Sequence, residues 1–101
     1  MYLVHTMQVV QSEVFTAWLD NVKDERAAAR IVTRIRRMEI GNAGDVRSVG
    51  EGVSEIRIDY GPGYRVYFSR RGRTLIILLC GGDKKSQRKD IAVAKRMAKE
   101  A

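Results

Sequence analysis

Residues 53–70 read VSEIRIDYGPGYRVYFSR, and this stretch decides the fold. Apolar residues alternate with polar or charged ones on both sides of a central GPG at 61–63. A two-residue period is typical of strands that bury one face, and Gly-Pro-Gly favours a tight turn. The stretch therefore predicts two neighbouring antiparallel strands, whose core face comprises Ile56, Ile58, Tyr60, Tyr64, Val66 and Phe68.

The sequence before this hairpin predicts one strand and two helices. Residues 3–10 are β-prone and indicate a first strand. Ser12 is placed to cap a short helix with apolar residues at helical spacing, and we expect its Trp18 to anchor the core beneath the sheet. Asp24 is placed to cap a longer second helix, which GNAG at 41–44 ends.

Two further strands and a last helix complete the pattern. VRSV at 46–49 indicates a short strand. TLIILLC at 74–80 is apolar without alternation, which predicts a central strand covered on both faces. Gly81 and Gly82 are expected to break this strand. The remainder has helical composition, with a thin apolar seam of Ile91, Ala94 and Ala98.

The predicted order β-α-α-β-β-β-β-α indicates an α+β fold. We expect an antiparallel sheet of about four strands, an N-terminal helical hairpin on one face and a C-terminal helix. A chain of 101 residues fits a single domain over 1–101. Residues 1–6 add little pattern and can be an extension outside the core, with Met7 as an alternative start.

Net charge is the informative feature of the composition. Nineteen Lys and Arg residues against twelve Asp and Glu give +7, which favours a polyanionic partner, either nucleic acid or an acidic protein. No apolar run approaches the roughly 20 residues of a membrane helix, and the start lacks a signal-peptide pattern. The single cysteine, Cys80, is expected to be a buried small hydrophobe. We therefore expect a cytoplasmic protein without membrane association.

Arg57, Arg65 and Tyr67 form the first candidate site. They fall on adjacent strands of the predicted hairpin and on the same, outward face, where we expect Arg65 to be exposed. Two close guanidiniums repel each other unless an anion lies between them, so the pair favours a phosphate site. The alternative is ordinary surface ion pairing, in which Glu55 and Asp59 neutralise these arginines.

The second candidate is the segment GGDKKSQRKD at 81–90. Residues 84–101 carry seven Lys and Arg against two Asp and Glu, and the two glycines can let a ligand backbone approach closely. A solvated helix face explains the same charges. If the segment binds RNA, the residues that we expect to contact it are Lys84, Lys85, Gln87, Arg88 and Asp90.

A third basic stripe lies along the second helix at helical spacing. Glu25 and Glu39 are placed to pair with part of it, and its simplest interpretation is the solvent face of an amphipathic helix. The stripe consists of Arg26, Arg30, Arg34 and Arg37.

Several chemistries can be set aside from the residues present. His5 is the only histidine, so neither a histidine acid–base pair nor a zinc site with Cys80 can form. The scattered carboxylates argue against a metal-dependent nuclease, and no cofactor is expected. Metal-free RNA cleavage by Arg, Lys and Tyr needs none of these groups. In that reaction the 2′-hydroxyl attacks the neighbouring phosphate, whose charge the cations neutralise.

Three segments resemble the RelE/ParE toxin superfamily, and most closely its HigB-like branch of phage-derived addiction-module killer proteins. They are FTAWLDNVKDERAAARI at 15–31, EIRIDYGPGYRVYF at 55–68 and LLCGGDKKSQRKDI at 78–91. The resemblance implies a RelE-like fold and an endoribonuclease that cleaves messenger RNA, commonly on the ribosome and without a metal. It also implies a cognate antitoxin, a small helix-turn-helix protein encoded alongside, with operator DNA bound only by the toxin–antitoxin complex.

The resemblance also implies roles for individual residues. Arg65 matches the family's strand arginine that handles the scissile phosphate, and Lys84 falls where the family places a basic residue near that phosphate. Arg57 belongs to the recurring E-(L/I)-R segment, and Tyr67 lies beside Arg65. The expected catalytic residues are therefore Arg57, Arg65, Tyr67 and Lys84. The tyrosine that stacks on the substrate base in RelE corresponds here to Asp90, so stacking must come from Tyr67 or a ribosomal base, or does not occur.

Two other functions fit the same resemblance. One is a ParE-like toxin that blocks DNA gyrase without being an enzyme. The other is an inactive relative that acts only by forming an antitoxin complex that binds its operator. A gyrase inhibitor does not need Arg57, Arg65 and Lys84 to cluster on one face, so that triplet favours the nuclease.

Overall fold

The computed structural model describes residues 6–100, and the predicted order of elements is confirmed within them. The first strand is shorter than predicted, and the part of that prediction before residue 6 lies outside the described residues. The elements are β1 (Gln8–Gln11), α1 (Glu13–Asp20), α2 (Glu25–Glu39), β2 (Val46–Gly50), β3 (Val53–Ile58), β4 (Tyr64–Arg71), β5 (Leu75–Asp83) and α3 (Gln87–Glu100).

The sheet is five-stranded and mixed, which corrects the expected antiparallel sheet of about four strands. Its spatial order is β1-β5-β4-β3-β2. The three pairs that involve β2, β3, β4 and β5 are antiparallel, whereas β1 lies parallel to β5. Local patterns show which residues form strands, but the pairing of β1 with a strand more than 60 residues later leaves no mark in either segment.

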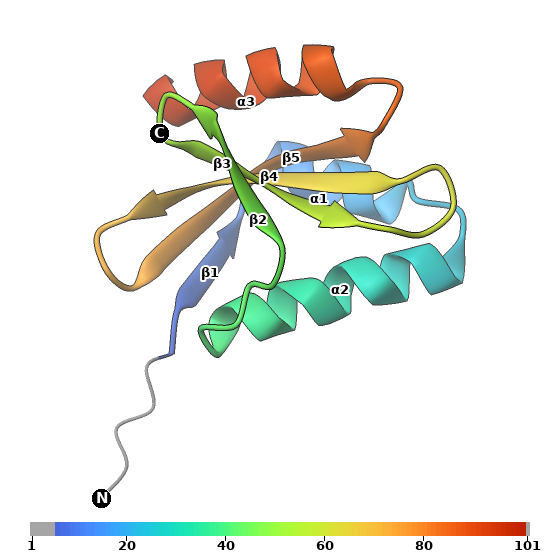
Figure 1. Ribbon diagram of the computed structural model, residues 1–101, viewed down its shortest axis with the longest axis horizontal. Coiled ribbons are helices and arrows are strands. Elements are labelled where there is room, and N and C mark those ends of the chain that lie inside the picture. The colour runs from blue at the N-terminus through green and yellow to red at the C-terminus, as the bar shows by residue number, and fades with distance from the viewer. Residues whose placement is uncertain (1–5, 101) are drawn as a thin grey trace, which may run out of the picture.

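The helices cover both faces of this sheet (Figure 1). On one face, α1 and α2 pack over a core that contains Phe15, Ile31, Ile56 and Leu78. On the opposite face, α3 packs over a second, smaller cluster that comprises Val53, Tyr67, Leu79, Cys80 and Ala94, with Ile91 and Ala98 beside it. The predicted seam of the last helix and the two-sided burial of β5 are therefore confirmed.

Side-chain caps fix where the first two helices begin. The Ser12 hydroxyl accepts a hydrogen bond from the Phe15 N–H at 3.0 Å and donates to the Leu79 carbonyl at 2.6 Å, so the cap also joins α1 to β5. The Asp24 carboxylate accepts from the N–H groups of Arg26 and Ala27. Both caps agree with the sequence-based expectation.

Gly81 and Gly82 do not break β5, which continues through both to Asp83. They instead make room for side chains of the protein itself. A Cβ at Gly81 would overlap the Trp18 ring, and one at Gly82 would overlap the Asp90 carboxylate. The expectation that these glycines admit a ligand backbone is therefore wrong, because the space is already filled.

Trp18 is half-buried and packs against the first core, with its ring centroid 5.6 Å from that of Phe15 and 6.4 Å from that of Tyr64. Of the helices in residues 6–100, none has the length and apolar character required to cross a bilayer.

Candidate active site

The register of the β3–β4 hairpin places the predicted site residues on one face of the sheet. Arg57 lies directly opposite Arg65, and Glu55 lies opposite Tyr67. Because these positions alternate with the buried Ile56 and Val66, all four side chains leave the sheet on the side that α3 covers. The predicted sharing of a face by Arg57, Arg65 and Tyr67 is confirmed.

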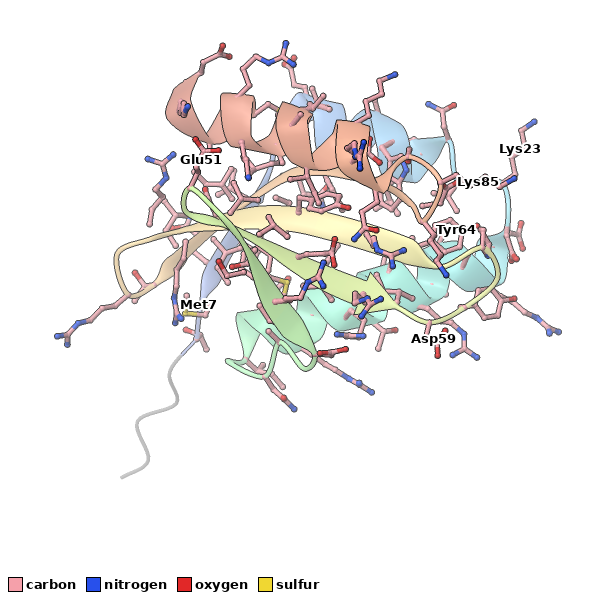
Figure 2. The ribbon with its side chains drawn as sticks, turned by 45° about the horizontal axis from the view of Figure 1, so that its top comes forward. Met7, Lys23, Glu51, Asp59, Tyr64 and Lys85 are labelled. Atoms are coloured by element: carbon pink, nitrogen blue, oxygen red, sulfur yellow. The ribbon has the colours of Figure 1, made fainter. Side chains whose placement is uncertain are left out.

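A cavity of about 320 Å³ opens at the end of the sheet where this hairpin turns and β5 runs into α3. It brings together three of the predicted cations, Arg57, Arg65 and Lys84. Figure 2 shows the same end of the molecule, where Asp59, Tyr64 and Lys85 are labelled. We call this cavity the hairpin pocket; its lining is completed by Asp45, Ile58, Asp59, Gly63 and Tyr64.

Arg65 is buried, with only 4% of its surface exposed, so the expectation of an exposed side chain is wrong. Its Nε lies 3.7 Å from the Oε2 atom of Glu55, which has no exposed surface at all. Its Nη1 donates to the Gly63 carbonyl at 3.2 Å. The ion-pair alternative therefore holds for Arg65, whose guanidinium is fixed from behind while it still contributes to the pocket wall.

Arg57 differs from its neighbour across the strands. It is exposed, and no carboxylate of the described residues lies within ion-pair distance of its guanidinium. Lys84 is also exposed and unpaired among those residues. Two exposed cations and one buried cation thus face a single pocket, an arrangement suited to binding a phosphate.

Glu55 links three elements beneath the pocket. Besides Arg65, its carboxylate accepts a hydrogen bond from Gln87 Nε2 at 2.9 Å and lies 3.7 Å from Arg47 Nη2. Gln87 is the first residue of α3, and Arg47 belongs to β2. Glu55 therefore connects the start of α3 to the central hairpin, and the Gln87 side chain, predicted to contact RNA, is used inside the protein.

Tyr67 is fully buried beneath α3, and its side chain does not line the hairpin pocket. Its hydroxyl has no hydrogen-bond partner among the described residues. Burial raises the pKa of Tyr67 above its ordinary value, and the nearby Glu55 carboxylate raises it further. The phenol is therefore neutral at physiological pH, and no face of the ring is open to a nucleic-acid base.

A turn at the start of the basic segment directs its side chains to different parts of the surface. The Asp83 carboxylate accepts hydrogen bonds from the N–H groups of Lys85 and Ser86, and Ser86 in turn donates to Asp90. Lys85 and Arg88 are exposed outside the hairpin pocket, whereas Asp90 is half-buried against Gly82. Arg88 and Gln87 border a separate shallow cavity with Arg47 and Ile91.

Five pocket residues were not predicted from the sequence as parts of a site: Asp45, Ile58, Asp59, Gly63 and Tyr64. Tyr64 was assigned only to the core face, yet it is half-buried and lines the pocket because it begins β4 at the turn. Gly63 has a φ of +80°, which a side chain rarely adopts, and its carbonyl holds Arg65. The position of GPG directly before Y-R was the signal that could have found both.

No group of three or more His, Cys, Asp or Glu side chains within residues 6–100 is arranged to hold a metal ion. The chemistry that the hairpin pocket offers comes from its three cations, its two exposed carboxylates and one aromatic ring.

Comparison with known proteins adds two similarities. Residues 17–99 match the family model described as phage derived protein Gp49-like, a span that covers both candidate segments. The chain is also 50% identical over 95 residues to an uncharacterized protein of Haemophilus influenzae, an alignment that covers 94% of this chain and 96% of that relative.

Proposed function

The chain belongs to the phage-derived Gp49-like family, and from this premise we propose that it is the toxin of a type II toxin–antitoxin pair. Members of the family are toxin-like and often occur in addiction modules. We further propose that the toxin is a metal-free endoribonuclease that acts on messenger RNA, as the resemblance to RelE and HigB-like toxins implies.

The observation that carries the proposal is the meeting of Arg57, Arg65 and Lys84 in the hairpin pocket. Cleavage of RNA by its own 2′-hydroxyl forms a bond from the 2′ oxygen to phosphorus and breaks the bond to the 5′ oxygen. Negative charge builds up on the phosphate oxygens during this exchange, and preorganised cations stabilise it. The products are a 2′,3′-cyclic phosphate and a 5′-hydroxyl end.

The three cations have different roles in this proposal. Arg65, held by Glu55 and Gly63, is the preorganised donor because its guanidinium needs no reorganisation when charge develops. Arg57 and Lys84 are exposed and close on the phosphate after binding. Asp45 or Asp59 can accept the proton of the 2′-hydroxyl, and the Lys84 ammonium can supply one to the departing 5′ oxygen.

An antitoxin is the partner that this surface and the family favour. The pocket is open and the protein carries a net charge of +7, so an acidic segment of a co-expressed protein can occupy it. We propose that a neighbouring gene encodes that protein.

Induced expression in a bacterial host tests the toxin proposal. We expect growth arrest by the wild type, relief by co-expression of the neighbouring gene, and loss of arrest in Arg57→Ala and Lys84→Ala. Arg36→Ala, an exposed arginine on α2 outside the hairpin pocket, is the matched control and should remain toxic.

The remaining outcomes favour other functions. Arrest that persists in both pocket variants while messages stay intact would favour a gyrase inhibitor. Absence of any arrest at comparable expression would favour a protein that acts only through its antitoxin complex.

A further inference from the structure

The arginine stripe of α2 is not a plain solvent face. Arg30, Thr33, Arg34 and Arg37 follow the spacing i, i+3, i+4, i+7 and so lie along one side of the helix. With Ile58 and Asp59 of the β3 end, they line a groove of about 250 Å³. We call this the helix groove. It adjoins the hairpin pocket, because Ile58 and Asp59 line both.

Within residues 6–100, the arginines of this stripe have no carboxylate partners. None of the described acidic residues lies within ion-pair distance of Arg26, Arg30, Arg34 or Arg37, although Glu25 and Glu39 were expected to pair with some of them. Like charges three and four positions apart on a helix repel each other and destabilise it slightly. Uncompensated repulsion of this kind is relieved when an anion binds.

Two contacts attach the stripe to the hairpin. Arg34 donates from Nη1 to the Arg57 carbonyl at 2.9 Å and from Nη2 to the Ala43 carbonyl at 3.2 Å. The Arg30 guanidinium lies over the Tyr60 ring, 4.6 Å from its centroid. Arg34 is therefore a structural link, whereas Arg30 and Arg37 are exposed and keep donors free for a ligand.

We propose that the helix groove is a second phosphate-binding site, which holds the backbone of the same RNA strand whose scissile phosphate lies in the hairpin pocket. This inference rests on the proposed function, since it assigns RNA to the pocket. A single strand extends by several ångströms per nucleotide, so adjoining basic sites naturally bind successive or nearby phosphates. Arginine is suited to this role because its planar fork of donors matches phosphate oxygens.

Asp59 at the junction is the one acidic residue of the groove. Its carboxylate can accept a hydrogen bond from the amino group of an unstacked base, a donor that a 2′-O-methyl strand keeps. The arginines of the groove and Asp59 together therefore suit the phosphates and the bases of one RNA strand, which is the occupant that we propose.

Binding of uncleavable RNA tests this inference without reference to activity. The probes are fluorescent 2′-O-methyl oligoribonucleotides of about three and about twelve nucleotides, whose blocked 2′ oxygens cannot attack; the longer one falls within the range of known single-strand sites. The test variant is Arg30→Gln with Arg37→Gln. The matched control is Arg26→Gln with Arg36→Gln, which removes the same charge from the same helix outside the groove.

For the long probe, we expect the test variant to bind roughly tenfold more weakly, with a salt slope shallower by about 1.4, because each lost phosphate contact on a single strand contributes about 0.7. The short probe should bind the test variant like the wild type, and the control pair should bind both probes like the wild type. Circular dichroism should show the same fold for all three proteins.

Four results would overturn the inference. They are an equal loss in test and control pairs, an equal loss for short and long probes, unchanged binding by the test variant, or no binding of the long probe by the wild type. If the test variant binds a poly-glutamate peptide more weakly than the wild type does, but binds RNA equally well, the groove would be assigned to an acidic protein instead. The short probe reports on the hairpin pocket alone, so failure of the proposed function is seen separately.

Discussion

Arg65 and Glu55 form the buried ion pair on which the hairpin pocket is built. Because Glu55 has no exposed surface, Arg65→Ala leaves a buried carboxylate with only Gln87 and the exposed Arg47. We expect this change to lower the free energy of unfolding by about 3–5 kcal/mol, the usual cost of removing one partner of a buried pair. Urea unfolding followed by Trp18 fluorescence measures it.

Two controls separate charge from contact in that experiment. Arg57→Ala removes an exposed arginine from the adjacent strand and should change stability by about 0.5 kcal/mol or less. The double variant Arg65→Ala with Glu55→Ala should be more stable than Arg65→Ala alone, since no unpaired charge remains. If Arg65→Ala is as stable as Arg57→Ala, Arg65 is not paired with Glu55 in the way that the structure shows.

Tyr67 and Cys80 make the protein sensitive to alkaline pH. Burial raises the pKa of both groups, that of Cys80 from 9.0 to about 12. Both therefore keep their protons longer in the folded protein than in the unfolded chain. Their contribution to stability is present below about pH 9 and is lost as the pH rises from about 9 towards 12.

Tyr67→Phe with Cys80→Ala should flatten this alkaline decline, measured as the urea midpoint between pH 8 and 11 at about 25 °C. Tyr67→Phe alone should cost little stability at pH 7, because the hydroxyl has no hydrogen-bond partner among residues 6–100. An unchanged alkaline slope in the double variant would place the titrating groups elsewhere.

At the scale of elements, α1 approaches β5 most closely where Trp18 meets Gly81. The Trp18 ring lies directly over Gly81, where a Cβ would overlap it. We expect Gly81→Ala to destabilise the protein by about 1–3 kcal/mol, as overpacking does. A second change, Trp18→Leu, should recover part of this loss in a double-mutant cycle. Thermal unfolding measures it, and strictly additive effects would contradict the contact.

The elements themselves could largely be predicted from the sequence. Alternation around GPG predicted β3 and β4, and both helix caps were read correctly because capping depends on neighbouring residues. The parallel partner of β1 could not be predicted in this way, since it depends on a distant segment. The continuation of β5 through Gly81 and Gly82 could not be predicted for a similar reason. The side chains that fill the space beside these glycines come from other elements.

Several residues of the candidate site were predicted from the sequence, but the burial of Arg65 and Tyr67 was not. A two-residue period places Arg65 and Tyr67 on one face, but it does not tell whether that face meets water or a helix. The seam of α3 was predicted, yet not that it would cover Tyr67. Arg65 can be buried because the buried Glu55 carboxylate pairs with it. From the sequence, Glu55 and Asp59 were equally possible partners.

At the scale of the whole molecule, six of the basic side chains line two adjoining cavities. The hairpin pocket and the helix groove adjoin at the end of the sheet where the β3–β4 hairpin turns above the first part of α2 (Figure 1). Two other lysines, Lys95 and Lys99, pair with Glu51 in the β2–β3 turn and so attach α3 to the sheet. These two lysines therefore attach α3, whereas the cations of the two cavities are those to which we assign ligand binding.

We propose that the hairpin pocket cleaves RNA by promoting attack of the RNA's own 2′-hydroxyl on the neighbouring phosphate. The most direct measurement adds the purified protein to a cell-free translation reaction and determines the position and chemistry of every new 5′ end. We predict breaks within the translated message that carry a 5′-hydroxyl, reduced about 10²–10³-fold in Lys84→Ala or Arg57→Ala. New ends that carry a 5′-phosphate, cleavage unaffected by either substitution, or a message left intact by the wild type would contradict it.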